Sequence, residues 1–357
     1  MECGIVGLPG VGKSCLFAAL TGAAAGTAGG GGFKANIGVA HIPDPRLPLI
    51  ASFITTKKIV PATMQFVDIP GVAQGNRGPA EAGKVNAFLS NVRQVDAICQ
   101  VVRCFGLPGS NLDPVRDMDA LETELILADL QVAESAMDKA ARTARTGDAE
   151  AKARVAALQK LIGRLNEGMP ARSATWTKDE QSILRSLGVI TAKPVLYVAN
   201  VGEDDLRGGS AAARAVSTAA AERAGECVAL CAKLEAELAE LGDADRQEML
   251  ESLGLAEPAI GPLARAAFRL LGLASFYTAG EKEVRAWSIP IGATAPDAAG
   301  AIHSDIQRGF IRAECFNVDD LVQFKSEKAI REAGKLRSEG RNYHLQDGDV
   351  VHFLFNV

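Results

Sequence analysis

Eight residues near the N-terminus have the types and the spacing that bind phosphate. The pattern G-x-x-x-x-G-K-[ST] is met by Gly7, Leu8, Pro9, Gly10, Val11, Gly12, Lys13 and Ser14. Glycines let backbone N–H groups turn around a β-phosphate, while the lysine would reach the β- and γ-phosphates and the hydroxyl would ligate Mg²⁺. We therefore predict that residues Gly7 to Cys15 bind a nucleotide, with Lys13 as the catalytic cation and Ser14 as a metal ligand.

A carboxylate and a glycine follow the apolar run Met64 to Val67, in the segment Asp68-Ile-Pro-Gly71. In enzymes with such a phosphate-binding loop, an aspartate at the end of a strand holds the magnesium ion. We predict that Asp68 is the second metal ligand and that the Gly71 N–H senses a γ-phosphate. The alternative is an ordinary turn at the end of a strand, for which Asp, Pro and Gly are also favoured.

A third group of polar residues, Asn200-Val201-Gly-Glu203, follows the apolar run Pro194 to Ala199. A guanine-binding protein would carry Asn-Lys-x-Asp here, because that aspartate accepts hydrogen bonds from the guanine N1–H and 2-amino group. Adenine has neither donor at those positions, so Val201 and Glu203 remove the reason for a guanine preference. We expect Asn200, Val201 and Glu203 to lie near the base of the bound nucleotide.

The elements that position these groups are short apolar runs that alternate with helical stretches. Beta-strands are expected at Cys3–Val6, Met64–Val67, Ala97–Val102, Pro194–Ala199 and Cys227–Cys231. This alternation predicts a parallel, doubly wound α/β sheet, and a helix is expected at Ser14–Leu20. In such sheets ligands bind at the carboxyl ends of the strands, where all three groups of candidate residues lie.

The chain closely resembles the YchF or Obg-like ATPase family over nearly its whole length. That family is built like the GTPases but prefers ATP, and the resemblance implies a Ras-like P-loop NTPase fold. Its markers are Pro43-Asp-Pro-Arg-Leu47, Phe66 to Gly71, Val95-Asp-Ala-Ile98, Val101 to Phe105, Val115-Arg-Asp117, Glu122 to Asp129 and Lys193 to Asn200.

The segment between Leu121 and Ile190 is rich in Ala, Leu, Arg, Lys and Glu, and Leu158, Leu161, Ile162 and Leu165 repeat with helical period. A break at Thr146-Gly147 predicts an antiparallel helical hairpin, an arm inserted in the nucleotide domain. Basic residues gather there and would suit the phosphates of ribosomal RNA, although a charged helix is often only a solvated face. They are Lys139, Arg142, Arg145, Lys152, Arg154, Lys160 and Arg164.

The C-terminal part, from Phe276 to Val357, resembles the TGS domain, a ubiquitin-like β-grasp module of several RNA-associated proteins. Its markers include Thr278 to Trp287, Gly309 to Glu314 and the alternating strand from Gln346 to Val357. The predicted domains are a P-loop domain at residues 1–120 and 191–273, the arm at 121–190 and the TGS domain at 274–357.

Three departures from the family pattern, and one feature shared with it, affect the expected chemistry. Gly10 stands where relatives commonly have an asparagine associated with potassium stimulation. The first-switch threonine has no match, and Thr27 or a water molecule is the candidate replacement. Val72 occupies the position of the water-orienting glutamine of Ras-like enzymes, as hydrophobic residues do in the family that the chain resembles, so intrinsic hydrolysis should be slow. Cys231-Ala232 replaces the Ser-Ala motif that often supports the base, and we predict that both residues belong to the nucleotide site.

Composition limits the class of protein. The chain has 357 residues, more than one core usually supports, and a formal net charge of −5 that excludes a globally basic nucleic-acid binder. Its seven cysteines include no C-x-x-C pair and fit reduced thiols. With no signal peptide or long apolar run apparent, we expect a cytoplasmic monomer without a membrane partner.

Taken together, these features and the family resemblance predict a Mg²⁺-dependent ATPase that acts as a nucleotide-dependent switch on the ribosome, with the large subunit and ribosomal RNA as its expected partners. Two alternatives stay open at this point. One is an RNA- or ribosome-binding protein that is gated by nucleotide and has negligible turnover. The other is a GTPase of the Obg class.

Overall fold

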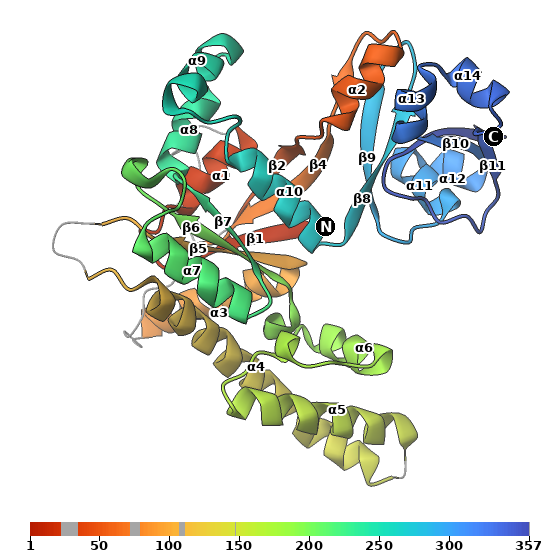
Figure 1. The fold of residues 1–357 in the computed structure, drawn as a ribbon. Coiled ribbons are helices and arrows are strands. Elements are labelled where there is room, and N and C mark those ends of the chain that lie inside the picture. Colours follow the sequence, from red (N-terminus) through yellow and green to blue (C-terminus); the bar gives the residue numbers. More distant parts are fainter. Residues whose placement is uncertain (23–34, 72–78, 107–110, 147, 357) are drawn as a thin grey trace. The chain divides into compact units, whose positions relative to one another are not determined.

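The structure is a computed structural model, and it describes residues 1–22, 35–71, 79–106, 111–146 and 148–356. The chain forms two compact units. The first consists of Met1–Gly38 and Gln65–Leu263, and the second of Val39–Met64 and Ala264–Val357. Figure 1 shows both units and the element labels used here.

A six-stranded sheet with the order β2-β4-β1-β5-β6-β7 forms the centre of the first unit, and its strands β2 and β4 continue into residues of the second unit. β1 pairs in parallel with β4 and β5, and β6 pairs in parallel with β5 and β7. The expected doubly wound sheet is thereby confirmed, and Cys231 lies just past the last strand. The strands are β1 (Glu2–Val6), β2 (Asn36–Ile42), β4 (Ala62–Asp68), β5 (Ala97–Arg103), β6 (Val195–Asn200) and β7 (Glu226–Leu230).

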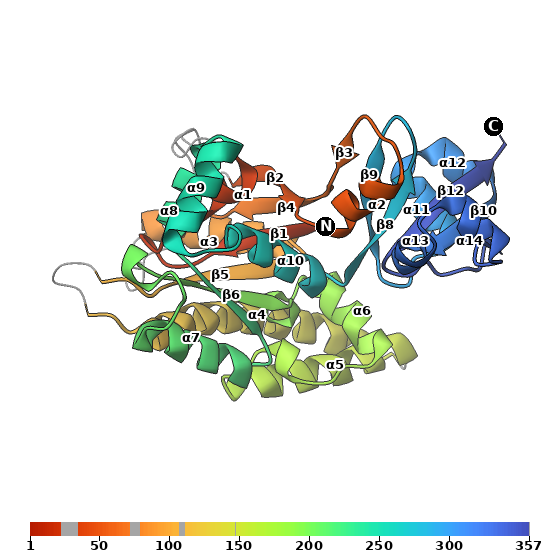
Figure 2. The ribbon, with the colours of Figure 1, turned by 45° about the horizontal axis from the view of Figure 1, so that its top comes forward.

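Helices cover both faces of this sheet. Figure 2 shows α1 and α8 on one side of it and α4 and α7 on the other. Residues of α3, α4 and α7 pack with the strands in one apolar core. The helices of this unit outside the arm are α1 (Lys13–Thr21), α3 (Pro79–Gln94), α7 (Ala211–Glu222), α8 (Ala232–Glu240), α9 (Asp243–Leu253), the short η3 (Glu203–Asp205) and the start of α10 (Ile260–Leu270).

The predicted arm is an antiparallel pair of helices, α4 (Pro114–Ala144) and α5 (Ala149–Asn166), followed by α6 (Lys178–Leu187). α4 is one continuous helix that begins at Pro114, seven residues before the predicted start of the arm at Leu121. Pro114 at its first position and the capping side chain of Asp113 favour a helix start at this point. Its first turns belong to the apolar core of the sheet domain. Asp148 caps α5 after the predicted break. Two short turns, η1 (Ala171–Ser173) and η2 (Ile190–Ala192), lead back to β6.

A stripe of small and branched apolar residues holds the arm together. Leu158, Leu161 and Leu165 are buried between its helices, as their spacing predicts, and Ile162 is partly buried. On α4 this stripe meets Ile126, Ala133 and Ala140. Burial of such side chains contributes about 1.5 to 3 kcal/mol each, which is enough to keep a short helical pair closed.

The second unit holds a mixed sheet with the order β11-β10-β12-β8-β9-β3. β12 pairs antiparallel with β10 and parallel with β8, and helix α11 packs beside β9 and β10, as in the predicted β-grasp. Its elements are α2 (Arg46–Phe53), β3 (Ile59–Val60), β8 (Leu273–Ala279), β9 (Val284–Pro290), α11 (Ala295–Ile302), α12 (Ser304–Arg308), β10 (Phe310–Asn317), α13 (Val318–Phe324), α14 (Glu327–Glu332), β11 (Arg337–Glu339) and β12 (Asp349–Phe355).

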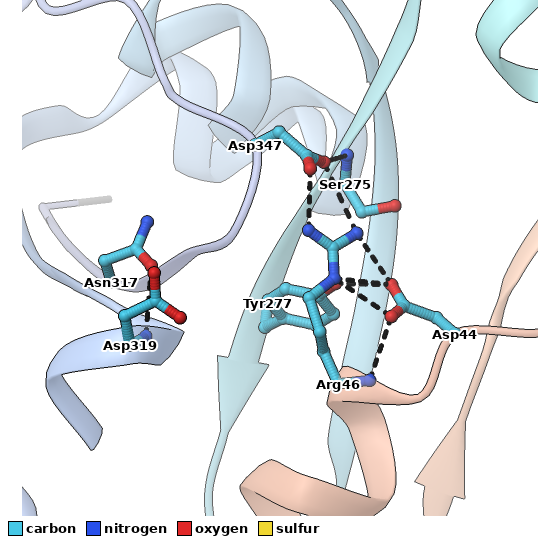
Figure 3. A network of polar contacts seen from close by, with 7 residues as sticks. All are labelled: Asp44, Arg46, Ser275, Tyr277, Asn317, Asp319 and Asp347. Carbon is cyan, nitrogen blue, oxygen red and sulfur yellow. Dashed lines mark hydrogen bonds and ion pairs between the residues drawn. The ribbon is translucent and has the colours of Figure 1, made fainter. Parts of the chain in front are cut away.

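Residues 39–64 belong to the second unit, whereas the sequence placed them in the nucleotide domain. The reason is a polar network around Arg46, shown in Figure 3. Its guanidinium binds Asp44 at 2.9 Å and Asp347 at 2.6 Å, and the Tyr277 hydroxyl donates to Asp44. Although burial opposes it, these hydrogen bonds lower the pKa of Asp44. The ion pair of Arg46 with Asp347, which is distant in sequence, thus holds residues 39–64 in the second unit.

Two findings bear on partners and cofactors. Over the described ranges, no helix combines the length and the apolar content needed to cross a membrane. Nor do three or more His, Cys, Asp or Glu side chains gather as a metal cluster in that part of the chain.

Candidate functional site

The loop between β1 and α1 is shaped by its glycines. Gly12 lies in the left-handed region, with φ of 95°, and precedes the first residue of α1. A Cβ atom at this position would lie 2.3 Å from Nδ2 of Asn200, which no side chain allows. Only glycine therefore lets the loop close on Asn200 and leave the N-terminus of α1 open to an anion.

Lys13 lies at the centre of this loop and is only 8% exposed. Its Nζ donates to the carbonyl oxygens of Gly7, at 3.1 Å, and Leu8, at 2.9 Å. Burial lowers the pKa of Lys13, and the nearby carboxylate of Asp68 opposes that effect. Gly71 approaches so closely that a Cβ there would lie 2.7 Å from the Lys13 Nζ. The loop thus presents one buried cation between two segments predicted to bind phosphate.

Ser14 and Asp68 meet beside Lys13, as expected for a shared ligand. The Ser14 hydroxyl donates to Oδ2 of Asp68 at 3.3 Å, and Asp68 is 6% exposed. Burial raises the pKa of Asp68, against the Ser14 hydrogen bond and the charge of Lys13. A hydroxyl and a carboxylate are the hard oxygen ligands that Mg²⁺ prefers, with water and phosphate oxygens completing the shell. The residues present fit a magnesium ion held with a nucleotide.

Asn200 ties the phosphate loop to the end of β7. Its Nδ2 donates to the carbonyl of Val11 at 2.8 Å, and its Oδ1 accepts from the N–H of Ala232 at 2.9 Å. The side chain is 4% exposed, so it spans two loops from inside the protein. Sequence reasoning placed Asn200 near the base but did not find this bridge. The side-chain amide of Asn200 thus forms hydrogen bonds with both loops. The N–H of Ala232 is already bonded to Asn200 and is therefore not a free donor for the base.

Glu203 lies at the surface beyond β6 and forms an ion pair with Lys233, whose Nζ is 2.7 Å from Oε1 of Glu203. Sequence analysis missed Lys233, although it directly follows the Cys231-Ala232 pair that it did single out. The hydrogen bond to Glu203 raises the pKa of Lys233. This pair marks the polar side of the region where the base is expected.

The remaining predicted site residues lie at the same edge of the sheet. Cys15 is half-buried in the first turn of α1, and Val201 is buried, with its N–H donating to the carbonyl of Leu230 at 2.9 Å. Cys231 precedes α8 and is 5% exposed, and burial raises the pKa of its thiol. Val72 and Thr27 lie outside the described residues.

The basic residues of the arm divide into two groups. Lys160 is bound within the arm, because its Nζ donates to Glu180 at 3.0 Å and lies 4.5 Å from the centre of the Trp176 ring. Arg164 pairs in the same way with Glu167 at 3.1 Å. The other five form no ion pair with any residue that the structure describes, and they cluster around the α4–α5 turn: Lys139, Arg142, Arg145, Lys152 and Arg154.

A glycine loop closed around a buried lysine, beside a serine and an aspartate at the edge of a parallel sheet, defines a P-loop nucleoside triphosphatase. Residues 2–139 match the family model described as a 50S ribosome-binding GTPase, and residues 273–356 match the model for the C-terminal domain of YchF GTPases, described as a protein of unknown function. The chain belongs to the YchF family.

Relatives align with this chain from end to end. The "Ribosome-binding ATPase YchF" of Escherichia coli O157:H7 is 43% identical over 364 residues, covering 100% of this chain and 99% of that protein. The protein of the same description from Bacillus subtilis is 42% identical over 368 residues, with both chains covered fully. The solved structure of the Schizosaccharomyces pombe YchF GTPase superposes with a TM-score of 0.86 at 31% identity, covering 99% of this chain and 97% of that one.

Proposed function

We propose that this protein is a cytoplasmic, ribosome-associated ATPase that binds Mg²⁺ and ATP and hydrolyses ATP slowly to ADP and phosphate. The observation that carries the proposal is the convergence of Lys13, Ser14 and Asp68 at the mouth of the P-loop, with contacts of 2.9 to 3.3 Å among the loop, the lysine and the two metal-ligand candidates. The names of the relatives, each a ribosome-binding ATPase, support the choice of substrate and partner.

In this mechanism the chain positions the triphosphate and offsets its charge. Backbone N–H groups of the loop and of the first turn of α1 bind the β-phosphate, and Lys13 neutralises the oxygens of the β- and γ-phosphates as water attacks in line. Ser14 and Asp68 would hold Mg²⁺, which supplies further charge neutralisation when bound. Because Lys13 is already desolvated, its charge acts on the phosphates with little screening.

The preference for adenine rests on what the base meets beyond β6. Asn200 is committed to the bridge between Val11 and Ala232, and Glu203 is paired with Lys233. The paired glutamate replaces the aspartate that would read the guanine N1–H and 2-amino group. We therefore propose that ATP binds more tightly than GTP.

The arm is proposed to contact ribosomal RNA on the large subunit through the five cations near the α4–α5 turn. These cations are unpaired within the described chain and lie on both sides of one turn, so that they can meet successive phosphates. Phosphate contacts of this kind release counterions and make association strongly salt-dependent. We propose that the protein acts there as a monomer.

Two measurements test the proposal. Calorimetric titration of nucleotide-free protein with Mg·ATP and with Mg·GTP decides the base preference, and tighter GTP binding would contradict it. Single-turnover hydrolysis with and without ribosomes decides the activity. Absence of phosphate release in both cases would favour the nucleotide-gated binding protein, for which Val72 at the water-orienting position is the supporting sequence feature.

A further inference from the structure

A short junction, residues 190–193, connects the arm to the strand that carries Asn200. The carboxylate of Asp129, on α4 of the arm, accepts three hydrogen bonds from this junction. Oδ1 accepts from the N–H of Ile190 at 2.9 Å, and Oδ2 accepts from the N–H and the hydroxyl of Thr191, both at 2.7 Å. Asp129 is 1% exposed. A buried carboxylate with so many donors is held in one position, because any shift would leave its charge unsolvated.

The other end of the junction holds α3. Nζ of Lys193 donates to the carbonyls of Val92, at 2.9 Å, and Arg93, at 2.7 Å, and also to that of Val95. These carbonyls belong to the last turn of α3 and to the residue after its end at Gln94, where no intrahelical donor is available. The three N–H groups of an ammonium match three such acceptors, and its charge suits the negative end of the helix.

Between its two ends the junction is too short to absorb a displacement. Ile190–Ala192 form the single turn η2, closed by a hydrogen bond of 3.0 Å from the N–H of Lys193 to the carbonyl of Ile190. The next residue, Pro194, accepts from the N–H of Ile98 at 3.0 Å and begins the pairing of β6 with β5. A movement of α4 at Asp129 is therefore passed to Lys193 over one rigid turn.

α3 packs against the segment that leads to Gly71. Val92 of α3 and Val95 lie in one apolar core with Ile69, and a Cβ atom on Gly4 would lie 2.9 Å from Cγ2 of Val95 and 3.0 Å from Cδ1 of Ile69. Gly71 packs so closely on the loop that a Cβ there would lie 2.5 Å from the carbonyl oxygen of Gly7. A displacement of α3 therefore acts on Ile69, two residues before the glycine that we predict to sense the γ-phosphate.

Building on the hydrolysis proposed above, we propose that Asp129 and Lys193 are positioning residues through which the arm sets the place of α3 and, with it, the rate of nucleotide hydrolysis. Neither residue belongs to the predicted nucleotide or metal site, and both act through α3. The inference assigns a route by which binding of the arm to RNA phosphates changes the activity of the P-loop site.

The charge on Lys193 gives the junction a pH dependence. Burial lowers the pKa of Lys193 to about 8, while the carboxylates of Asp96 and Asp129 favour its charged form and Arg93 disfavours it. Below this pH three N–H donors face three carbonyls. Above it the neutral amine retains two, so one carbonyl of α3 loses its donor and the grip on the helix weakens.

The first test measures the junction without any reference to activity. Hydrogen exchange of the peptide spanning α3 is followed in the full-length, nucleotide-free protein and in the variants Lys193→Met, Lys193→Arg and Asp129→Asn. Lys328→Met is the matched control, since that lysine is 86% exposed in its side chain and lies in the second unit. We expect faster exchange in the last turn of α3 for both Lys193→Met and Asp129→Asn, and no change for the control.

Asp129→Asn decides whether the residues form a junction. Faster exchange in α3 on substitution of Lys193 alone would make this lysine a local helix cap and overturn the proposal. If Asp129→Asn yields too little folded protein, Thr191→Val removes one of the three donors without burying a new charge and is read in the same way. Protection of α3 should also decline above about pH 8 in the wild type but not in Lys193→Arg, whose guanidinium stays charged.

The second test measures the effect on the reaction. We expect Lys193→Met and Asp129→Asn to lower ribosome-stimulated hydrolysis of ATP about tenfold, with Lys193→Arg recovering part of it and with ATP affinity changed less than about twofold. The double variant should lose little more than either single one, because both act through one turn. Unchanged hydrolysis in both single variants would refute a positioning role. If the wild type itself releases no phosphate, the proposed ATPase function fails, while the exchange measurement still tests the junction.

Discussion

The phosphate loop and the tip of the arm both depend on basic residues, but they use them in opposite ways. Lys13 is 8% exposed and bound to two carbonyls, whereas Lys139, Arg142 and Arg145 are exposed and form no ion pair among the described residues. The first cation is desolvated in advance and fixed in place. The side chains at the arm tip are hydrated and exposed to solvent.

This difference determines how each region should respond to substitution. In the loop the geometry of one group matters, so a single change should remove the function whatever the salt concentration. At the arm tip the proposed RNA contacts would depend on the number of charges, because each phosphate contact contributes by releasing a counterion. The arm should therefore lose affinity in steps, and those steps should shrink as salt is added.

The largest effect is expected for Lys13→Ala. The change removes the only lysine of the P-loop motif and leaves the carbonyls of Gly7 and Leu8 to face the phosphates. Loss of charged hydrogen bonds worth about 3 kcal/mol should weaken Mg·ATP binding by about a hundredfold or more. Calorimetric titration at two salt concentrations measures this loss. A deficit that largely disappears at high salt would place Lys13 in the same class as the arm cations.

A smaller but still local effect is expected for Asn200→Ala. It leaves the carbonyl of Val11 and the N–H of Ala232 buried without their partners, at a cost of about 1 to 3 kcal/mol. ATP affinity should fall about tenfold, and the melting temperature should fall with it. Asn166→Ala, on the exposed end of α5, is the control. Normal affinity together with normal stability in Asn200→Ala would show that the two loops need no bridge.

The same contrast explains how much of the site could be predicted from sequence. The phosphate loop depends on residues that are close together in the chain. The spacing of its glycines therefore predicted the places of Lys13 and Ser14, as well as the strand before them and the helix that follows. Asn200 was predicted as a residue of the base region, but its bridge to Val11 joins residues 189 positions apart. No local pattern contains that contact. The Glu203–Lys233 pair was missed for the same reason.

The fold shows the same limit at larger scale. Apolar runs predicted the parallel sheet, and the Leu158 to Leu165 stripe predicted the closed arm, because both are periodic signals. The place of residues 39–64 was not foreseen. It depends on the ion pair between Arg46 and Asp347, which are 301 positions apart in the sequence. A single ion pair of this kind produces no periodic sequence pattern from which it could be predicted.

A graded effect is expected for the triple variant Lys139→Ala, Arg142→Ala, Arg145→Ala. Ribosome association should weaken, and the slope of log affinity against log salt should fall by about 2 to 3, since each lost phosphate contact removes about 0.9. ATP affinity should stay at the wild-type value because none of these residues lies near the P-loop motif. Association measured across a salt series tests the prediction. An unchanged slope would remove the arm from the proposed RNA interface.

The smallest effect is expected for Lys160→Gln, and it separates position from charge within the arm itself. Sequence counted Lys160 among the basic residues, but its ammonium already binds Glu180 and the carbonyl of Thr175, and it lies over the Trp176 ring. Its charge is neutralised within the arm, so substitution should leave the salt slope unchanged and lower only the thermal stability of the arm. The measurement is the same salt series, run beside a thermal melt. A loss of slope equal to that of one residue in the triple variant would mean that the arm binds through its total charge, and the division into paired and unpaired cations would have to be abandoned.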